Sequence, residues 1–451
     1  MNSKSVQQQK LAYSEIPTLC QIETTYACNQ DCIACYNPER TKLGNLPKMD
    51  TIVASVAESQ IPHVYLIGGE PSMLREERLN RYIELLSDHS SVTIVTNGRI
   101  KLEGISPKLA CFGIPIHGCD AETHDRFTQS VGGFDKTIDT IKYYVGQGFD
   151  VRCIPVLTGY NYNQMFSIIQ LAADLGMESV FVDRFEDGGL GAQNLAIFRS
   201  LEPTPEQFRI AVGQIIEAKH SFASLKGKVG FGTAIPYCLD QRIIEEGIQS
   251  ACGVGTSFCV LSPKGEFRIC NQSKVVYGNV LESPIEVLWH KRSLNGFRCL
   301  EWVTEPCTSC QLLMKCAAGC KVDVNHSDTY CIDYAVRGQK GPSQEILNKL
   351  AYPEPAEIYP EQLRRFGVNR YTKITTRYKT PLLVTRYQTV ELDGMAFEMV
   401  KAICGGIDSE QELISRFQEM VDLPEIRLLV SRMFQVEAID QKGEEQYVNP
   451  Y

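Results

Sequence analysis

The 451-residue sequence lacks the features that would place the protein in a membrane or on nucleic acid. It has no uninterrupted apolar run of membrane-spanning length, and its first residues, MNSKSVQQQKLAYSE, have no apolar segment such as a signal peptide needs. Positive charge is also lacking: the formal net charge is -9, whereas phosphate binding needs a basic surface. We therefore expect an acidic cytoplasmic protein that binds neither membrane nor nucleic acid.

Cysteine, in contrast, is abundant, with 18 residues in the chain. In a reducing compartment such a number rarely indicates disulfides, so metal binding or redox chemistry is the first explanation to test. The chain is too long for one average domain, and its 43% hydrophobic content is enough for two or three units that each bury a core. Internal repeats and low-complexity segments are lacking as well.

From residue 17 to about 186, short apolar segments alternate with segments of helical periodicity. Residues 134–148 and 162–176 predict helices that end at Gly148 and Gly176. The apolar segments are too short for helices and predict buried strands at 19–27, 63–70, 91–98, 111–117, 151–158 and 179–185. This order predicts an α/β fold with a parallel sheet and outer helices, either a partial (βα)6 TIM barrel or an open wound sheet.

Several polar segments follow directly after these predicted strands. They are Cys28, the turn GGEP at Gly68–Pro71, TNG at Thr96–Gly98, and His117. In both architectures the ligand site lies at the carboxyl ends of the strands. We therefore expect these segments to gather on one rim.

The second half of the chain has a different character. Residues 187–250 combine a Gly-rich segment with a helical pattern at 206–220, and residues 252–331 are dense in cysteine and poor in periodic segments, as expected where metal holds a fold. A proline-containing linker follows at about 340–375. After the strand-like segment 380–393, periodicity predicts short helices at Gly394–Ile403, Glu410–Phe417 and Pro424–Phe434, the outline of a small winged-helix domain.

The stretch CNQDCIACYNP places Cys28, Cys32 and Cys35 at spacings of four and three. A zinc site takes four ligands, so three cysteines indicate either a fourth ligand elsewhere in the chain or a coordination position that is left open for another molecule. A four-iron cubane held by three thiolates leaves one iron open to a substrate or cofactor.

This CxxxCxxC loop, with GGEP after the next strand, resembles the radical S-adenosylmethionine (SAM) superfamily. The resemblance implies that the open iron chelates SAM and that electron transfer from the cluster releases a 5'-deoxyadenosyl radical. It also implies that the GGEP turn binds the SAM amino group, which suits exposed glycine carbonyls and a carboxylate. The candidate SAM contacts are Gly68, Gly69, Glu70, Pro71, Tyr36, Asn97 and Arg152.

Two segments depart from the family's pattern. Ala34 precedes the third cysteine, where an aromatic residue is common, and Tyr36 follows it. PIHG at Pro115–Gly118 stands where the family often has SxDG, which leaves contacts from that serine or aspartate in doubt. Arg152 on the fifth strand is a candidate partner for the SAM carboxylate, because a guanidinium pairs with it bidentately. An arginine paired within the barrel is the alternative.

A second cysteine series follows the predicted barrel. Two four-thiolate zinc sites are one explanation of the bare spacing. After a radical SAM core, however, the series resembles the SPASM extension with two auxiliary four-iron clusters. The resemblance assigns Cys252, Cys259, Cys270 and Cys320 to one cluster, and Cys307, Cys310, Cys316 and Cys331 to the other. The remaining cysteines are expected to be mostly buried small hydrophobes: 20, 111, 119, 153, 238, 299 and 404.

The last hundred residues resemble the peptide-recognition domain of enzymes that mature ribosomally made peptides, a winged-helix unit related to the pyrroloquinoline-quinone peptide chaperone. Leu392, Asp393 and the pair Gly405 and Gly406 stand at the positions of its motif. The resemblance implies that a leader peptide adds as a strand at a sheet edge. DNA binding is disfavoured because the helix segment DSEQELISRFQEM is acidic. A dimerisation or structural module is the remaining alternative.

Together these resemblances predict a radical SAM/SPASM enzyme that modifies a precursor peptide carrying a leader. The cofactors would be SAM and three [4Fe-4S] clusters, with flavodoxin or ferredoxin as electron donor. Because eight ligands would fill both auxiliary clusters, we expect carbon–carbon crosslinking or backbone excision rather than thioether formation through a cluster-bound cysteine. The sequence assigns no catalytic acid or base.

Two other functions fit parts of the sequence. An anaerobic sulfatase-maturing enzyme shares the eight-cysteine extension and oxidises Cys or Ser on a protein, and a non-catalytic zinc-binding scaffold would explain the cysteines without SAM. The expected organisation is an N-terminal extension (1–16), a radical SAM core with its bridge (17–235), a SPASM domain (236–340), a linker (341–374) and a winged-helix domain (375–451).

Overall fold

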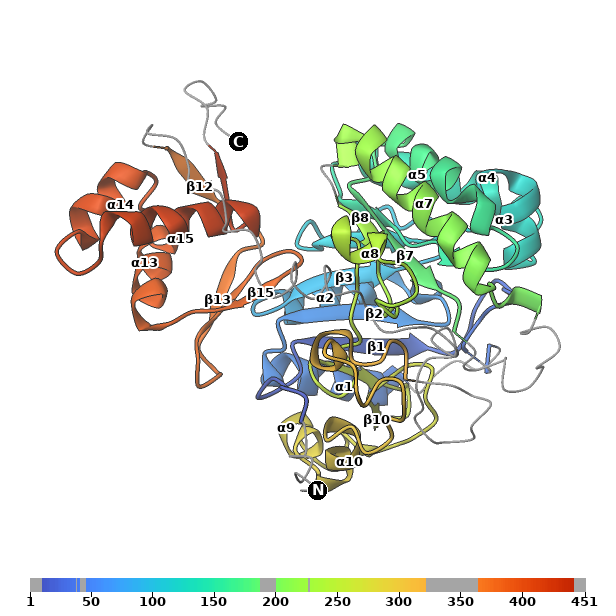
Figure 1. The fold of residues 1–451 in the computed structure, drawn as a ribbon, viewed down its shortest axis with the longest axis horizontal. Helices are drawn as coiled ribbons and strands as arrows, with labels where there is room; N and C mark the ends of the chain where they lie inside the picture. Colours follow the sequence, from blue (N-terminus) through green and yellow to red (C-terminus); the bar gives the residue numbers. More distant parts are fainter. Residues whose placement is uncertain are drawn as a thin grey trace, which may run out of the picture.

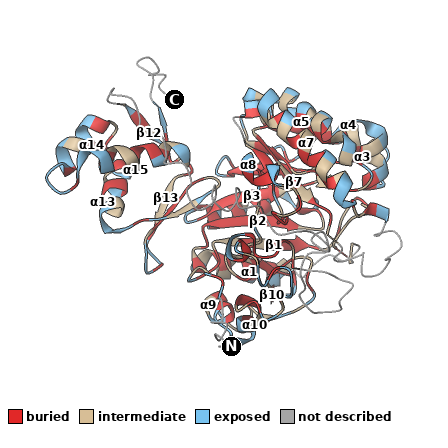
Figure 2. Ribbon diagram, in the orientation of Figure 1, coloured by how far each residue is buried: buried red, intermediate tan, exposed pale blue. Residues whose placement is uncertain are grey.

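The computed structural model describes residues 10–37, 39–40, 46–186, 200–225, 228–321 and 364–441. Figure 1 shows a larger part, in which helices pack against a curved sheet, and a smaller C-terminal unit beside it. In Figure 2 the strands of the larger part are almost wholly buried, while exposed residues lie mainly on the surrounding helices and the C-terminal unit. No helix among the described residues is long and apolar enough to cross a membrane.

The sheet of the larger part contains eleven strands of the described chain, in the order β11-β10-β9-β1-β2-β3-β4-β5-β7-β6, with β8 paired to β7. The predicted strands are confirmed as its parallel centre: β1 (Leu19–Thr25), β2 (His63–Gly68), β3 (Ser91–Val95), β4 (Cys111–Ile114), β5 (Val151–Cys153) and β7 (Ser179–Arg184). β6 (Val156–Leu157) and β8 (Val229–Phe231) also run parallel to β7.

Helices connect these strands and cover the outer face of the sheet (Figure 1). The predicted helices at 134–148, 162–176 and 206–220 correspond to α4, α5 and α7. Apolar side chains from strands and helices, such as Ile22, Ile52 and Val64, form one continuous core. The helical elements are α1 (Leu46–Ser59), η1 (Pro71–Met73), α2 (Glu76–Ser87), α3 (Ala121–Thr128), α4 (Gly133–Gly146), η2 (Tyr162–Gln164), α5 (Met165–Asp174), α7 (Pro205–Ser221) and η4 (Ala223–Leu225).

Contacts on the inner face show that the sheet curls into a partial barrel. Nη1 of Arg152 on β5 donates a hydrogen bond of 3.1 Å to the hydroxyl of Tyr65 on β2, although β3 and β4 lie between these strands. In a flat sheet three inter-strand steps would separate the two backbones by about 14 Å. The curled sheet therefore brings side chains of distant strands together, and this answers the choice left open by the sequence in favour of a barrel-like fold.

The cysteine-rich region extends the sheet beyond β1. β9 (Phe258–Leu261) runs parallel to β1, β10 (Glu266–Arg268) antiparallel to β9, and β11 (Gly278–Asn279) antiparallel to β10. The remaining elements here are short, as the lack of periodicity predicted. They are α8 (Arg242–Glu245), α9 (Ile285–Trp289), η5 (Arg292–Leu294), α10 (Asn295–Arg298) and α11 (Leu313–Cys316).

The C-terminal unit, residues 364–441, has a core of its own around Phe366, Val400, Leu413 and Val430. The predicted helices are confirmed within one residue at each end: α13 (Gly394–Cys404), α14 (Glu410–Phe417) and α15 (Leu423–Gln435). The strand-like segment forms the hairpin β14 (Leu382–Val384) and β15 (Thr389–Glu391), with β13 (Lys373–Thr375) on its other side. β12 (Phe366–Val368) pairs with β16 (Ile439–Gln441).

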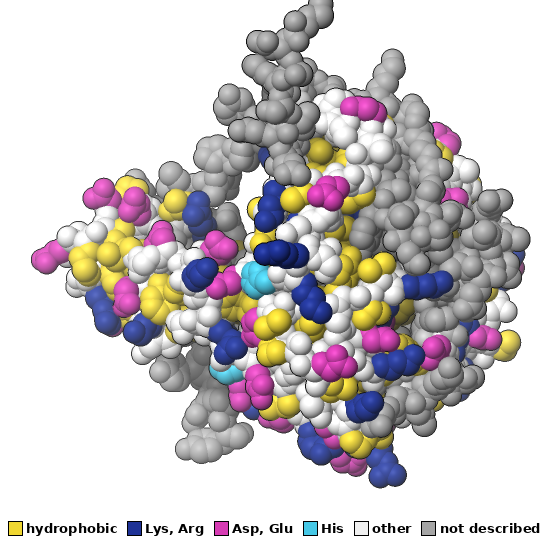
Figure 3. All heavy atoms as spheres, turned by 90° about the horizontal axis from the view of Figure 1, so that it is seen from below, with side chains coloured by type: hydrophobic (Ala, Val, Ile, Leu, Met, Phe, Trp, Pro, Cys, Tyr) yellow, Lys and Arg dark blue, Asp and Glu magenta, His cyan; other side chains and the backbone are white. Residues whose placement is uncertain are grey.

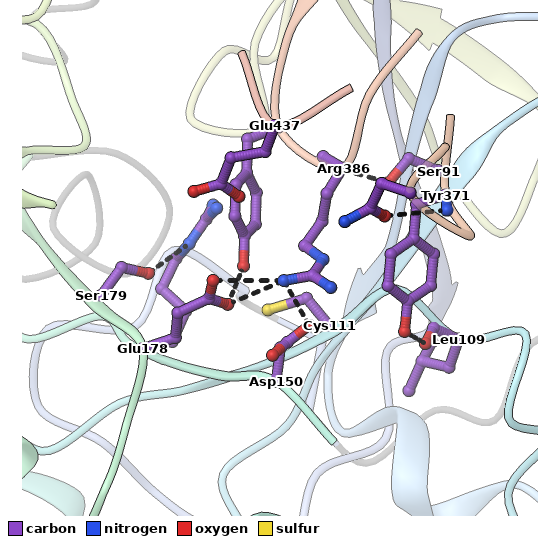
Figure 4. A network of polar contacts seen from close by, with 12 residues as sticks. Ser91, Leu109, Cys111, Asp150, Glu178, Ser179, Tyr371, Arg386 and Glu437 are labelled. Carbon is purple, nitrogen blue, oxygen red and sulfur yellow. Dashed lines mark hydrogen bonds and ion pairs between the residues drawn. The ribbon is translucent and has the colours of Figure 1, made fainter. Parts of the chain in front are cut away.

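The turn between β14 and β15 docks the C-terminal unit on the amino ends of the barrel strands (Figure 4). Nη1 of Arg386 lies 2.5 Å from Oδ2 of Asp150, just before β5, and 3.1 Å from Oε1 of Glu178, just before β7. The Tyr387 hydroxyl donates to the same Glu178 carboxylate. The Ser91 hydroxyl, at the start of β3, donates to the Arg386 carbonyl over 2.8 Å. One turn therefore contacts the starts of several strands at once.

The electrostatics of this junction follow from its burial. Burial alone would raise the pKa of Glu178, but hydrogen bonds from Tyr387 and Lys228 and the charge of Arg386 outweigh it and hold the pKa below its usual range. For Asp150 burial has the larger effect, and its pKa is raised although Arg386 opposes the change. Lys228 also pairs with Glu437 of the C-terminal unit, which adds a second ion pair across the junction.

Candidate functional site

The cysteine loop follows β1 and is held by backbone hydrogen bonds rather than by regular structure. The Cys28 N–H donates to the Arg40 carbonyl over 2.8 Å, which closes the loop on itself. The Ile33 N–H donates to the carbonyl of Phe127 at the end of α3 over 3.0 Å. The Cys35 N–H donates to the Cys32 carbonyl over 3.3 Å, which forms a tight turn between these two cysteines.

The structure brings the three thiols of this loop together. Burial raises the pKa of Cys28 to about 11, with a smaller increase from the Cys35 thiol. Burial also raises the pKa of Cys32, and both other thiols add to the increase. Among the described residues no group of three His, Cys, Asp or Glu side chains is gathered tightly enough for a single metal ion. In an iron–sulfur cubane, each thiolate binds a different iron.

The GGEP turn lies directly against the cysteine loop. The Gly69 N–H donates to the Thr25 carbonyl over 2.6 Å. A Cβ on Gly69 would lie 2.0 Å from the Ala27 carbonyl oxygen, so only glycine allows this close approach of the two backbones. The Tyr36 hydroxyl, one residue after the third cysteine, donates to the Gly68 carbonyl over 3.2 Å. The first two strand ends are thereby joined at the rim.

Glu70 has a different set of partners from the one that the resemblance implied. Its Oε1 accepts from the Ser72 N–H (2.9 Å) and the Thr96 hydroxyl (2.6 Å), and its Oε2 accepts from the Asn97 N–H (2.7 Å). The side chain is 1% exposed, and burial raises its pKa although these hydrogen bonds oppose the change. Glu70 therefore ties the end of β2 to the end of β3, while Pro71 begins η1 behind it.

The TNG turn contributes a third contact to the loop. Nδ2 of Asn97 donates to Oδ1 of Asn29 over 2.7 Å, and Nη1 of Arg99 donates to the Asn29 carbonyl over 3.1 Å. His117 also lies past its strand end as expected, but it is buried, stacks on Phe127 at 3.9 Å and borders a cavity of about 60 Å³. Burial lowers the pKa of His117, so this imidazole is neutral at physiological pH.

Arg152 lies elsewhere on the inner face. Besides Tyr65, its guanidinium donates to the Ser179 hydroxyl over 3.3 Å and stacks on Phe181 and Tyr387 at 4.7 and 4.5 Å. Ser179 is the first residue of β7, and Tyr387 belongs to the docked turn, so these contacts place Arg152 toward the amino ends of the strands. Arg152 is therefore an arginine paired within the barrel, the second of the two alternatives that its position in the sequence left open. We no longer count Arg152 among the candidate SAM contacts.

Unpartnered donors around the cysteine loop test whether these residues suit the implied cofactors. Nε2 of Gln30 and the Nε groups of Arg40 and Arg99 are buried and have no acceptor within the described ranges. Buried N–H groups without an acceptor are costly, so such groups favour an acceptor-rich partner. With three converging thiols and glycine backbone at contact distance, the rim fits an iron–sulfur cluster and a ligand such as SAM.

The sequence reasoning missed Asp183 near the end of β7. Phe181 faces Arg152 on the inner side, and alternation along the strand places Asp183 on the same side. Phe185, two residues later, packs with Ile33 of the cysteine loop. Burial raises the pKa of Asp183 to about 7, although Arg152 opposes the change. A carboxyl group that titrates near neutral pH can give and take a proton. The sequence could have indicated Asp183, because an acidic residue stands there at an inward-facing position of a predicted strand.

Arg268 on β10 was missed as well. It forms an ion pair with the buried Glu23 of β1, and its Nη1 donates to the carbonyls of Asn271 and Ser273, each over 3.1 Å. These carbonyls belong to the turn that follows Cys270. The pair thus anchors that turn to the inner face of the barrel. Its signal in the sequence, an arginine two residues before a cysteine in GEFRIC, is too common to have been informative.

The later cysteines group differently from the implied assignment. The Cys252 thiol contributes to the raised pKa of Cys270, which burial chiefly raises to about 12, so these two lie together. Cys259 instead stands beside Cys20 in the pairing of β9 with β1, and both are fully buried in the core. The alternation of β9 turns Cys259 toward the helices. The structure therefore does not bring Cys259 to Cys252 and Cys270.

The second implied set is only partly inside the described residues. Cys307, Cys310 and Cys316 lie on neighbouring turns, since the Cys310 N–H donates to the Cys307 carbonyl over 3.0 Å and α11 ends at Cys316. Cys320 is half-buried. Cys331 lies outside the described residues. Cys238, which we took for a small hydrophobe, proves to lie beside Cys307, Cys310 and Cys316.

Family models identify two parts of the chain. Residues 22–172 match the model of the radical SAM superfamily, and residues 252–311 match a model described as an iron–sulfur cluster-binding domain, SPASM. The chain therefore contains a radical SAM domain followed by a SPASM domain, the class that the cysteine loop and the barrel rim define. It is homologous to radical SAM enzymes, as the curated relatives show.

Curated relatives cover most of their own length. They include the AdoMet-dependent heme synthase of Methanosarcina barkeri, 26% identical over 356 residues (71% of this chain, 98% of that protein). The mycofactocin maturase MftC of Mycolicibacterium smegmatis is 27% identical over 323 residues (66% and 76%). The PqqA peptide cyclase of Bradyrhizobium diazoefficiens is 24% identical over 327 residues (68% and 82%).

Solved structures support the same fold. Streptococcus suis SuiB bound to its precursor peptide SuiA has a TM-score of 0.54 and 16% identity, with 72% of this chain and 76% of that chain covered. The protein anSMEcpe with bound AdoMet and the Cp18Cys peptide has a TM-score of 0.56 and 16% identity, with 74% and 96% covered. At such identities the likeness concerns the fold alone.

Proposed function

We propose that this protein is a radical SAM/SPASM enzyme that modifies a ribosomally made precursor peptide. The observation that carries the proposal is the meeting of the cysteine loop, the GGEP turn and the TNG turn on one barrel rim, with a separate C-terminal unit docked at the opposite end. Relatives named as a peptide maturase and a peptide cyclase support a peptide as substrate.

Cys28, Cys32 and Cys35 would hold a four-iron cluster, and the backbone of Gly68 and Gly69 would contact SAM. Tyr36, Glu70 and Asn97 would act by holding these groups in place, since their polar atoms already bind the protein. When bound, the cluster and SAM supply a 5'-deoxyadenosyl radical for hydrogen abstraction. The chain's own contribution is to orient the ligands and to provide Asp183 as a group that can accept a proton from the peptide.

The auxiliary clusters would carry the electron that remains when the product radical closes or breaks a bond, with flavodoxin or ferredoxin as external donor. We retain three clusters in all. The expectation of carbon–carbon crosslinking or backbone excision rather than thioether formation rested on eight ligands that fill both auxiliary clusters. Because Cys259 lies in the core and not beside Cys252 and Cys270, full ligation of the first cluster is no longer supported, and we propose no particular bond.

The C-terminal unit would bind the leader peptide in the manner of a winged-helix recognition domain. In the β14–β15 hairpin, the Thr385 N–H donates to the Gln388 carbonyl and the Leu392 N–H to the Pro381 carbonyl. In an antiparallel pair hydrogen-bonded positions alternate, so the N–H and C=O groups of Thr389 and Glu391 point away from β14. Within the described ranges β15 is the last strand of its sheet, so it presents an edge to which an extended peptide can add.

The surface of this unit is better suited to a peptide than to DNA. On the face drawn in Figure 3, the C-terminal unit carries apolar side chains among charges of both signs. Met395, Met420 and Leu423 are large apolar residues of this unit whose side chains are exposed. A DNA-binding face would be basic, because phosphate contacts dominate affinity.

For the organisation of the chain we propose a radical SAM core with its bridge at 17–235, a SPASM domain at 236–340 and a recognition unit at 375–451. Arg364 and Phe366 contact Glu410 and Asp408, so these residues also belong to the C-terminal unit. β13 and β12 therefore belong with the helices, and the unit includes residues before the proposed boundary at 375.

Mass spectrometry of candidate precursor peptides, after anaerobic incubation with SAM and reductant, tests the proposed reaction. A change of mass at a defined residue is the expected result. SAM cleavage without modification of any peptide, together with turnover of an iron tetrapyrrole, would instead favour the second candidate function. That alternative comes from the heme synthase relative, which this chain covers almost completely.

Recognition at β15 has a sharper test than deletion of the unit. Glu391→Pro removes an outward N–H that an added strand needs, whereas a proline is tolerated on an edge strand because it leaves the pairing with β14 intact. Glu391→Ala keeps the N–H and is the matched control. The proline variant is expected to weaken precursor binding and spare SAM cleavage. Equal affinity in both variants would contradict recognition at this edge.

A further inference from the structure

Cys238 lies between β8 and α8, well before the cysteine-rich series, and is half-buried. It packs against an apolar cluster that contains Cys307, Leu313 and Ala317. Its thiol is therefore placed beside the segment that carries the later cysteines, although the two segments are far apart in sequence.

The preceding residue makes a second contact with the same segment. Tyr237 is buried in a cluster with Leu312 and Cys316, against which Cys310 also packs. The Tyr237 hydroxyl lies 3.5 Å from the carbonyl oxygen of Lys315, the residue before Cys316. Two consecutive residues thus hold the turn at 237–238 against residues 307–316.

The two apolar clusters gather four thiols around this turn. Cys307 belongs to the cluster against which Cys238 packs, and Cys316 and Cys310 belong to the cluster of the adjacent Tyr237. Cys238 is therefore the fourth member of a group of thiols rather than an isolated small hydrophobe.

We propose that Cys238 is the fourth thiolate ligand of the iron–sulfur cluster held by Cys307, Cys310 and Cys316. On binding iron, the thiol loses its proton to solvent, and the sulfur contributes an electron pair to the metal. Cys238 replaces Cys331 of the implied set in this role. The inference concerns the iron–sulfur domain alone, so its failure would leave the proposed peptide substrate untouched.

Substitution with a spectroscopic readout tests the assignment. Cys238→Ser is expected to change the electron paramagnetic resonance signal of one reduced cluster, because an oxygen replaces a sulfur on one iron. Cys299→Ser is the matched control, as Cys299 is half-buried in the same region. It and Cys331→Ser are expected to leave all signals unchanged. A wild-type signal in Cys238→Ser, combined with an altered signal in Cys331→Ser, would overturn the assignment.

Alkylation of the unmodified, iron-loaded protein provides a test that does not depend on how the variants fold. The thiolate is the reactive form, and metal ligation removes it from reaction. Cys238 is expected to react with iodoacetamide at least about tenfold more slowly before iron chelation than after it. Cys299 reports on any local unfolding caused by chelation, and its rate should change less. Equal changes at both cysteines would contradict ligation by Cys238.

Discussion

Strand β2 meets different surroundings at its two ends. At the carboxyl end, Gly68 and Gly69 lie against the cysteine loop with no room for side chains, and buried N–H groups nearby have no acceptor in the described residues. At the amino end, His63 bonds to Thr389 of the C-terminal unit over 3.1 Å, next to charges that are paired across the junction.

This difference separates a binding site from a structural contact. Both ends gather polar groups from several strands, so the presence of polar groups alone does not mark the site. What distinguishes the carboxyl end is that three thiols converge there beside a turn whose Gly69 leaves no room for a side chain. At the amino end each carboxylate has a cationic partner, as expected for groups that fix one unit on another.

The largest effect is expected from Cys32→Ala, which removes one of the three thiols proposed to hold a cluster at the carboxyl end. SAM cleavage, measured as 5'-deoxyadenosine by chromatography, should fall to background because the proposed cluster would lose one of three thiolates. Cys404→Ala is the control, since Cys404 is exposed on the C-terminal unit. Undiminished cleavage in Cys32→Ala would remove the cysteine loop from the site.

Gly69→Ala should disturb the close backbone contact at the carboxyl end while it keeps all three cysteines. The new Cβ would meet the Ala27 carbonyl at 2.0 Å, so we expect a loss of about 3 kcal/mol in the free energy of unfolding and weaker SAM binding. Gly146→Ala, in α4, has no heavy atom within 4 Å of its new Cβ and should stabilise by about 0.5–1 kcal/mol. Thermal unfolding and equilibrium dialysis with SAM measure the two effects.

At the amino end, Arg386→Ala should leave Asp150 and Glu178 without a shared cation. We expect a loss of about 2–4 kcal/mol in the unfolding free energy, because breaking a largely buried pair leaves uncompensated charge. Lys379→Ala is the control. The Lys379 side chain is 88% exposed, and its ion pair with Glu15 is long, at 3.9 Å between Nζ and Oε1. Its replacement should therefore change the unfolding free energy by no more than about 0.5 kcal/mol. Equal denaturation midpoints for the two variants would show that the junction is not held by these charges.

The smallest effect should be a pH dependence of the same junction. Burial lowers the pKa of His63 from 6.5 to about 4, although a hydrogen bond with the Gln388 backbone opposes the change. The unfolded chain therefore binds more protons between pH 6.5 and pH 4, and stability present above pH 6.5 is lost as the pH falls through this window. The loss is at most about 3 kcal/mol. His63→Gln should flatten this part of the stability profile in denaturant titrations, and an unchanged slope would contradict the assignment.

The strands and most helices could be predicted from the sequence because they depend on the local hydrophobic pattern. The gathering of the polar turns on one rim could be predicted because the carboxyl ends of parallel strands lie at the same end of the sheet. The partners of individual side chains could not. Glu70 is bound by groups on the next strand end, and Arg152 points toward a turn more than two hundred residues away. Cys259 lies beside Cys20 in the core and Cys238 packs beside Cys307, because strand alternation and a tertiary contact decide where a thiol points. The spacing of cysteines in the sequence contains neither.

The docked turn at Arg386 and Tyr387 also changes what a truncation would measure. Tyr387 stacks on Arg152, and Arg386 pairs with Asp150 and Glu178 at the starts of β5 and β7. Removing the C-terminal unit would therefore leave buried charged groups of the barrel without these partners. A truncated enzyme would report on a destabilised barrel as well as on lost recognition, whereas Glu391 variants leave the contacts of Arg386 and Tyr387 in place.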